Sequence, residues 1–142
     1  MAAIVVFDEI IANLGAAKIA FGSDTHKLTI CTDAPSEAGD TTIADATQIS
    51  ATGGYAAATL AGVTYAETAG GSGIWMFDAT DRTFTASGAN FDAGRYLRLY
   101  DDTPTSPADP LICDWDYGTN FTLTDGNTFT AVFNASGILR IS

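Results

Sequence analysis

Apolar residues recur with two different periods along the 142-residue chain. In residues 7–15, "FDEIIANLG", they stand at positions 7, 10, 11 and 14, which is the spacing of one face of an α-helix. Gly15 lies where such a helix would end. Beyond this segment, short runs alternate apolar and polar residues, which is the period of a half-buried strand. The pattern predicts one short N-terminal helix followed by β structure.

Turn-forming residues separate the alternating runs. The first expected hairpin joins residues 18–21, "KIAF", to residues 26–32, "HKLTICT", through "GSDT". Residues 74–79, "IWMFDA", form a dense apolar run that is typical of a core strand. Further runs lie at 110–117, 120–124, 127–133 and 137–142. Because Asp-Gly between two alternating runs is a strong hairpin signal, we expect the C-terminal runs to form a β-meander.

A proline-rich segment separates two of the expected strands. Residues 95–100 and 111–117 are rich in apolar side chains, and three of the four prolines lie between them. Proline cannot donate the main-chain hydrogen bond that a central strand needs. We therefore expect residues 102–110 to form an exposed connection and the two flanking strands to pair in one sheet.

Alternation divides residues 95–100 into two faces. Tyr96, Arg98 and Tyr100 share one face, and the two leucines between them share the other. We expect the leucines to face the core and the Tyr/Arg/Tyr face to point outward. Tyrosine and arginine are enriched at protein interfaces, so this face is a candidate contact surface, with ordinary exposed surface as the alternative.

The spacing of the turns indicates the fold class. Strand breaks recur about every 8–12 residues, as in a β-sandwich or a barrel. Residues 34–48 are polar and long for a connection in a compact domain, which predicts a functional or mobile loop. With 46% hydrophobic residues, the chain is expected to form a single domain over residues 1–142, with an N-terminal arm and helix in residues 1–15.

The charge balance disfavours several classes of partner. The chain has 17 acidic and 6 basic residues, for a net charge of -11. Nucleic acids and anionic membranes are bound by lysine and arginine, so we expect neither as a partner. No apolar run reaches the roughly 18 residues of a membrane-spanning helix. The first basic residue is Lys18, so the N-terminus does not match a secretory signal, and we expect synthesis and use without export.

The chain offers few residues for catalysis. His26 is the only histidine, and it stands at an expected turn without a nucleophile motif beside it, so we predict an exposed surface residue. Cys113 alternates with apolar neighbours and is expected in the core, while a bridge to Cys31 stays open as an alternative. No P-loop, zinc-ligand spacing or dinucleotide-binding motif occurs. We therefore expect no catalytic residues, no cofactor and no enzyme activity.

Asp114 and Asp116 begin a spacing that resembles a calcium loop. The segment lacks the central glycine and the final glutamate of such a loop. Because the two aspartates alternate with Cys113, Trp115 and Tyr117, we instead expect a strand with both carboxylates on its solvated face. No metal site is therefore predicted. Both tryptophans, Trp75 and Trp115, stand at expected core positions.

Several short phrases follow one another in a fixed order along the chain. They are "FD" at the expected helix, "KIAF" with "HKLTICTDAP", a Gly-Tyr strand, "FDA", "RYLRLYDDTP" with "DPLI", and "DGNTFT" with "NASGIL". In this order the chain resembles small β-rich virion proteins of tailed bacteriophages, and among them the head decoration or cement proteins. The resemblance covers nearly the whole chain.

The resemblance implies a jelly-roll-like β-sandwich that forms homo-oligomers on the capsid exterior. Its partners would be the major capsid protein and further copies of the same chain, after synthesis in the host cytoplasm. Such a protein stabilises the head lattice by adding buried area across subunit joints, and it needs no cofactor. An acidic protein on the outside would not compete for packaged DNA.

Two segments are candidate interfaces under this hypothesis. The apolar N-terminal arm, with Ile4, Val5, Val6 and Phe7, could dock on a neighbour, and Tyr96, Arg98 and Tyr100 form the second set. The phrases "NTFTAVFN" and "GILRIS" are further candidates for pairing edge to edge with another subunit.

Other functions stay open on the sequence. A tail or fibre-base protein could share the same composition. A carbohydrate-binding β-sandwich module would need a solvent-exposed tryptophan, and a small hydrolase would need two carboxylates with raised pKa values in one cleft.

Overall fold

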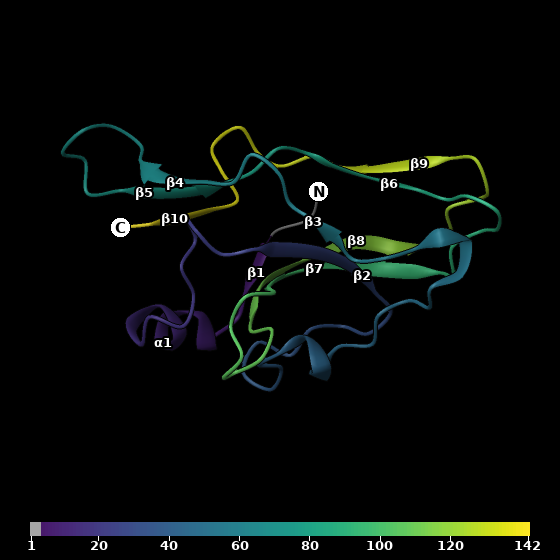
Figure 1. The fold of residues 1–142 in the computed structure, drawn as a ribbon, viewed down its shortest axis with the longest axis horizontal. Coiled ribbons are helices and arrows are strands. Elements are labelled where there is room, and N and C mark those ends of the chain that lie inside the picture. Colours follow the sequence, from purple (N-terminus) through teal and green to yellow (C-terminus); the bar gives the residue numbers. More distant parts are fainter. Residues whose placement is uncertain (1–3) are drawn as a thin grey trace.

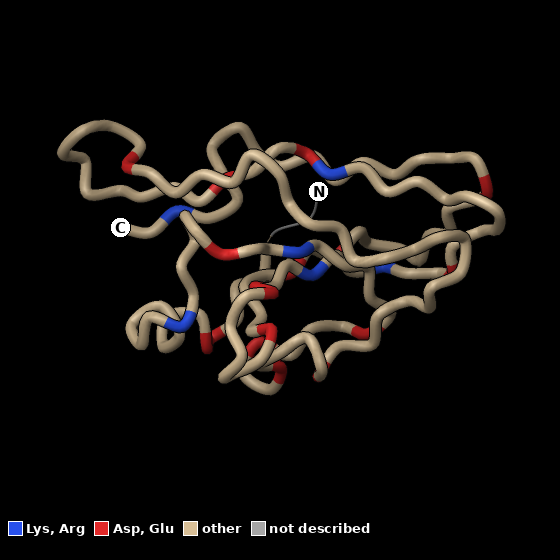
Figure 2. The backbone as a smooth tube through the Cα atoms, in the orientation of Figure 1, with Lys and Arg blue, Asp and Glu red and all other residues tan. Residues whose placement is uncertain are grey.

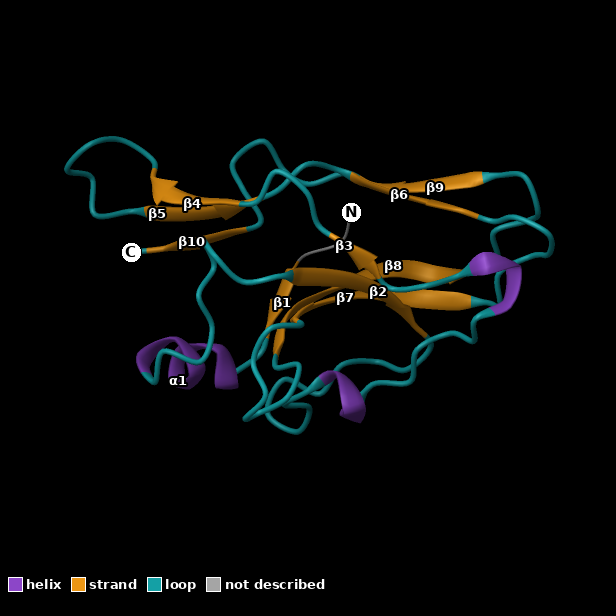
Figure 3. Cartoon of the chain, in the orientation of Figure 1, coloured by secondary structure: helices purple, strands orange, loops and turns teal. Residues whose placement is uncertain are grey.

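The computed structural model describes residues 4–142 and consists mainly of β-strands, with one α-helix in that range. The prediction of a β fold with a short N-terminal helix is confirmed at this level. The strands form sheets of five, three and two members (Figure 1). Figure 3 shows that long loops connect these sheets and cover one side of the molecule.

The five-stranded sheet is the centre of the fold. Its order is β1 (Ile4–Val6), β8 (Leu111–Phe121), β7 (Gly94–Asp101), β2 (His26–Cys31) and β3 (Ala58–Thr59). All neighbouring strands in it are antiparallel. β7 and β8 pair directly, with Leu97 opposite Trp115, as the sequence predicted for the strands around the proline-rich loop.

Two smaller sheets form a second layer on one side of the central sheet. The first has the order β10 (Leu139–Ile141), β5 (Trp75–Asp78) and β4 (Thr64–Glu67). The second pairs β6 (Arg82–Thr85) with β9 (Thr128–Ala131). Figure 1 shows both of these sheets above the central one. The core fills the space between the two layers, where Leu97 and Leu99 pack in one apolar cluster with Phe77 and Phe84.

The other side of the central sheet carries the helix and long loops. α1 (Glu9–Gly15) buries Ile10, but Ile11 of the predicted apolar face is 67% exposed, and Asn13 is buried instead. Two short 3₁₀ turns, Ile43–Asp45 and Thr52–Gly54, lie in the loops between β2 and β3. Among residues 4–142, no helix is both long and apolar enough to cross a bilayer.

The predicted strand pairings near both ends of the chain were wrong. Residues 18–21 are not a strand, and β2 pairs instead with β7 and β3. The C-terminal runs do not form a meander, because β9 pairs with β6 and β10 pairs with β5. Gly118, expected in a turn, lies within the continuous strand β8.

The loop at residues 34–48 has a structural task that its sequence did not reveal. It covers the lower face of the central sheet, where Ile43 packs with Tyr100, Phe7 and Leu111 in a second apolar cluster. Its fold is held by hydrogen bonds from the Thr41 and Thr42 amides to the Asp45 carboxylate. The Tyr/Arg/Tyr face of residues 96–100 is therefore covered and does not point to solvent.

Candidate functional site

The single histidine is buried, which corrects the prediction of an exposed turn residue. His26 begins β2 and is 1% exposed. Its Nε2 donates to the Phe21 carbonyl oxygen at 3.2 Å, and its Nδ1 lies 3.8 Å from Asp101 Oδ2. Burial lowers the pKa of His26 and raises the pKa of Asp101 to about 7.

This buried pair does not form an active site. Both side chains are fully enclosed, and His26 packs edge-on against the Phe77 ring at 5.0 Å. A substrate would need direct access to a catalytic acid or base, and neither group reaches the surface. The pair instead joins the end of β7 to the start of β2, which pair with each other there.

A second buried polar cluster surrounds Arg98 in the middle of β7. Its Nε donates to Asp114 Oδ2 at 3.0 Å, and its Nη1 donates to Asp33 Oδ2 at 3.0 Å. Nη2 donates to the Asp33 main-chain oxygen at 3.0 Å and lies 3.7 Å from Asp40 Oδ2. The guanidinium is fully buried, so Arg98 holds the loop onto the sheet.

This cluster also changes the expected roles of Asp114 and Cys31. Burial raises the pKa of Asp114 to about 6, against the opposing effect of Arg98, and raises the pKa of Cys31 to about 12. Asp114 was expected on a solvated face, but it is fully buried. Its carboxylate binds Arg98, and Asp116 binds Arg95 with two bonds of 2.7 Å.

The calcium-like spacing therefore does not gather its carboxylates around one point. Asp114 and Asp116 each pair with a different arginine of β7. Within residues 4–142, no group of three or more His, Cys, Asp and Glu side chains is arranged to hold a metal ion.

The two cysteines are free and buried. Cys31 pairs in register with Tyr96, and Cys113 pairs with Leu99. Tyr96 and Leu99 lie on opposite faces of β7, so the two thiols lie on opposite faces of the sheet. The alternative of a Cys31–Cys113 bridge is wrong for this fold.

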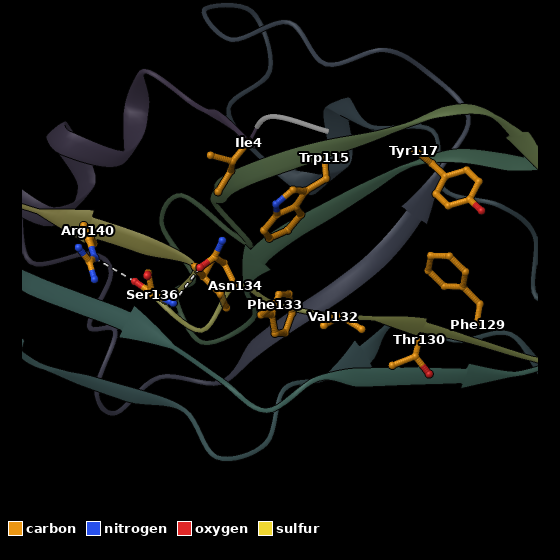
Figure 4. Close-up of a pocket in the computed structure, with 12 residues that line it drawn as sticks. Ile4, Trp115, Tyr117, Phe129, Thr130, Val132, Phe133, Asn134, Ser136 and Arg140 are labelled. Atoms are coloured by element: carbon orange, nitrogen blue, oxygen red, sulfur yellow. Dashed lines mark hydrogen bonds between the residues drawn. The ribbon is translucent and has the colours of Figure 1, made fainter. Parts of the chain in front are cut away.

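An apolar groove lies between the central sheet and the C-terminal strands (Figure 4). Its volume is about 790 Å³. Ile4 of β1 and Trp115 and Tyr117 of β8 line one side of the groove. β9, β10 and the turn between them provide the other side. Distant parts of the chain, the first described strand and the last one, thus meet around one hollow.

Aromatic rings form much of the groove and its support. Trp115 is 6% exposed and packs against Phe133 with ring centroids 5.8 Å apart. Tyr117 is 47% exposed, and its ring lies 5.8 Å from Phe129 in an edge-on arrangement. Phe129 in turn stacks on Phe121 at 4.8 Å. The rings support one another, so the groove is shaped before anything binds.

Hydrogen bonds between side chains and the main chain hold the turn at the end of the groove. The Ser136 amide donates to Asn134 Oδ1 at 2.8 Å, and Arg140 Nε donates to the Ser136 carbonyl oxygen at 2.9 Å. Gly137 adopts a φ of 91°, and a side chain there would collide with Met76. The turn is therefore a fixed wall of the groove.

The groove is almost without charge in a strongly acidic protein. Its lining residues include Arg140 and no carboxylate. Residues 117–142 contain one acidic and one basic residue, Asp125 and Arg140, so the whole net charge of -11 belongs to residues 1–116. Figure 2 shows many of the acidic positions in the loops below the central sheet.

The predicted interface residues separate into two groups in the structure. Ile4 lines the groove and Val6 is 38% exposed, while Val5 is half-buried. Phe7 is fully buried, so this part of the expected arm belongs to the core. Residues 1–3 of the arm lie outside the described range.

The second set of predicted interface residues is mostly enclosed. Arg98 is fully buried and Tyr100 is 5% exposed, while Tyr96 is half-buried. The expectation of an outward Tyr/Arg/Tyr surface was wrong, because the loop at 34–48 and the acidic residue Asp33 cover it. The groove residues Phe129 and Val132 lay within the phrase "NTFTAVFN", which the sequence indicated only as a strand edge.

The two tryptophans also differ from the prediction that both lie in the core. Trp115 is buried, whereas Trp75 is 43% exposed. Trp75 lies at the end of β5 with its ring 5.2 Å from that of Tyr65. Tyr65 in turn contacts Phe21 at 5.4 Å, so an aromatic row leads from the core to the surface.

Comparison with protein-family models, with curated proteins and with solved structures finds no match to this chain.

Proposed function

We propose that this protein is a structural component of a tailed-bacteriophage virion, a cement or decoration protein that stabilises the head lattice from outside. The proposal also takes the two strand layers as a jelly-roll-like sandwich. The resemblance of the sequence phrases motivates it. The observation that carries it is the open, aromatic and nearly uncharged groove on an otherwise acidic scaffold.

The groove suits protein docking better than catalysis. Aromatic and aliphatic side chains dominate its lining, and such residues carry most of the binding energy at protein interfaces. The two carboxylates with raised pKa values, Asp101 and Asp114, are fully buried elsewhere in the fold. A hydrolase would need such groups in an open cleft.

The distribution of charge fits a position on the outside of a shell that encloses DNA. An anionic surface is repelled by phosphates and therefore does not bind packaged DNA. The neutral C-terminal region leaves one part of the surface on which a protein partner can approach without electrostatic repulsion.

The direct test is binding to procapsids and mature capsids of the phage that encodes the protein. Purified protein is mixed with each form, and co-sedimentation is followed together with the melting temperature of the capsid. Saturable binding with a raised melting temperature is expected, because a ligand of the assembled state stabilises that state. Failure to bind either form would remove the cement function and direct attention to tail assembly.

A carbohydrate-binding module is the second candidate, because Trp75 is exposed. An exposed ring beside Tyr65 offers an apolar face on which a sugar could stack. This function predicts that a bound glycan changes the fluorescence of Trp75 and that Trp75→Phe alters the response. If wild-type protein shows no fluorescence change across a panel of neutral and acidic oligosaccharides, this candidate is excluded for that panel.

A further inference from the structure

Exposed apolar side chains project from the rim of the groove, so a hollow and a protrusion lie side by side on the same surface. Val132 lies at the rim and is 59% exposed, and Tyr117 beside the hollow is 47% exposed. Figure 4 shows these side chains on opposite sides of the groove. A two-fold dimer joins the same patch on both subunits, so that patch has to be complementary to itself. A groove with Val132 projecting at its rim meets this requirement, because the projecting side chain of each copy can enter the groove of the other.

Electrostatics also restricts what can come close. Two copies that each carry -11 repel each other over most of their surfaces. This repulsion is weak at the groove, since Arg140 is the one charged residue among its described lining residues and residues 117–142 are neutral in sum. Contact between two grooves would keep the acidic loops of both copies away from the interface.

The polar atoms of the groove favour an apolar occupant over a glycan. Thr130 shares a 2.8 Å hydrogen bond with Thr83, and Asn134 Oδ1 already accepts from the Ser136 amide. Arg140 Nε is used by the Ser136 carbonyl oxygen. Sugar recognition requires donors and acceptors aimed at hydroxyl groups, and several of those in the groove already have partners within the fold.

We propose that the groove is the interface of a two-fold homodimer, in which Val132 and Tyr117 of each copy pack into the groove of the other. The inference goes beyond the cement function and does not depend on it. Because both copies are acidic, added salt screens their repulsion and strengthens the dimer. Most salt bridges between proteins respond in the opposite direction.

Sedimentation equilibrium of the full chain tests the proposal, at low and at high sodium chloride. A monomer–dimer equilibrium is expected, with a smaller Kd at high salt. Val132→Asp should raise the Kd by roughly a hundredfold, because it places a carboxylate in the apolar centre of the interface. Val132→Ala should raise it by a smaller factor, and it removes the risk that a buried charge simply unfolds the chain.

Ile11→Asp is the matched control. Ile11 is an apolar residue of α1 that is 67% exposed, and it does not line the groove. The same change there adds the same charge and should leave the Kd within about threefold of the wild-type value. Circular dichroism and thermal melting confirm that each variant is folded.

Either of two results would overturn the dimer. One is a chain that stays monomeric at every concentration and salt. The other is a dimer that both Val132 variants leave intact. A dimer without capsid binding would remove the cement function alone, and capsid binding by a monomer would remove the dimer alone.

Discussion

The two faces of the central sheet are closed in different ways. On the lower face, loops cover a buried arginine that is bound by Asp33 and Asp114. On the upper face, apolar side chains from two smaller sheets cover most of the surface, but the end of β8 near Trp115 and Tyr117 opens into the groove. The lower face is covered through specific ionic contacts, whereas part of the upper face stays open to solvent.

The difference between the faces indicates where stability and binding reside. A buried ion pair fixes the relative position of the segments that it joins, because its partners tolerate few arrangements. Removing one partner is strongly destabilising. An open apolar groove contributes little to the stability of the monomer, because its surface stays in water until something covers it. Substitutions on the lower face should therefore change mainly the stability of the monomer, and substitutions in the groove should change mainly its association.

The largest effect is expected from Arg98→Met. The change removes the one cation that contacts Asp114 among residues 4–142 and leaves a buried carboxylate without that partner. It should lower the free energy of unfolding by about 3–5 kcal/mol, measured by urea denaturation. A double variant, Arg98→Met with Asp114→Leu, should recover part of the loss, since position 114 then carries no buried charge.

Arg95→Met is the control for this prediction. Arg95 lies three residues earlier on the same strand and pairs with Asp116, but its side chain is 36% exposed. Its loss should cost about 0–1 kcal/mol. If both arginine variants lost equal stability, the lower face would not owe its closure to Arg98.

The second effect is a dependence of stability on pH. The pKa of Asp114 is about 6 in the folded protein, above its value of roughly 4 in an unfolded chain. Between these values the folded state holds a proton that the unfolded state has lost, so stability falls as the pH rises from about 4 to about 6. The expected fall is on the order of 2 kcal/mol.

Asp114→Asn isolates this contribution. Urea unfolding at several pH values should show a flatter profile for the variant than for the wild type. Asp101, whose pKa is raised to about 7, makes stability fall in the same direction, and His26, whose pKa is lowered, acts in the opposite direction. Both groups are unchanged in Asp114→Asn, so the difference between the two profiles reports on Asp114. Parallel profiles for the two proteins would show that Asp114 is ionised throughout.

A smaller effect is expected at the loop that covers the lower face. Asp45 accepts hydrogen bonds from the Thr41 and Thr42 amides and caps the short 3₁₀ turn. Asp45→Ala should cost about 1 kcal/mol. Amide hydrogen exchange should become faster in residues 41–46 before it changes in β9, and equal changes in both places would contradict a local role.

The smallest effect on stability is expected in the groove itself. Tyr117→Ser removes an exposed ring and should change the free energy of unfolding by roughly 0.5 kcal/mol or less. The measurement is urea unfolding at a protein concentration low enough to keep the chain monomeric. A loss comparable with that of Arg98→Met would show that the groove is part of the core.

Local sequence patterns predicted the elements that depend on near neighbours. The helix at residues 7–15, the paired strands around the proline-rich loop and the core position of Cys113 all follow from spacing along the chain. The sequence could not show which face of residues 96–100 would be covered. Alternation separates two faces, but it does not identify the loop that closes one of them.

The groove was still harder to predict. It joins Ile4, Trp115 and Phe133, which are far apart in the sequence and meet only after three sheets have formed. The alternating pattern of the C-terminal segments predicted hairpins between neighbouring strands, whereas β9 and β10 pair with strands from the middle of the chain. The exposure of Trp75, the first residue of β5, was likewise not evident from its apolar neighbours in the sequence.

Local spacing and composition are enough to predict the β-rich class, the short helix, the exposed turns and the acidic balance of the chain. The burial of Arg98 and His26, and the groove beside the C-terminal strands, depend instead on contacts between distant segments. Burial depends on which distant segment covers a side chain, and strand register over long separations sets that choice.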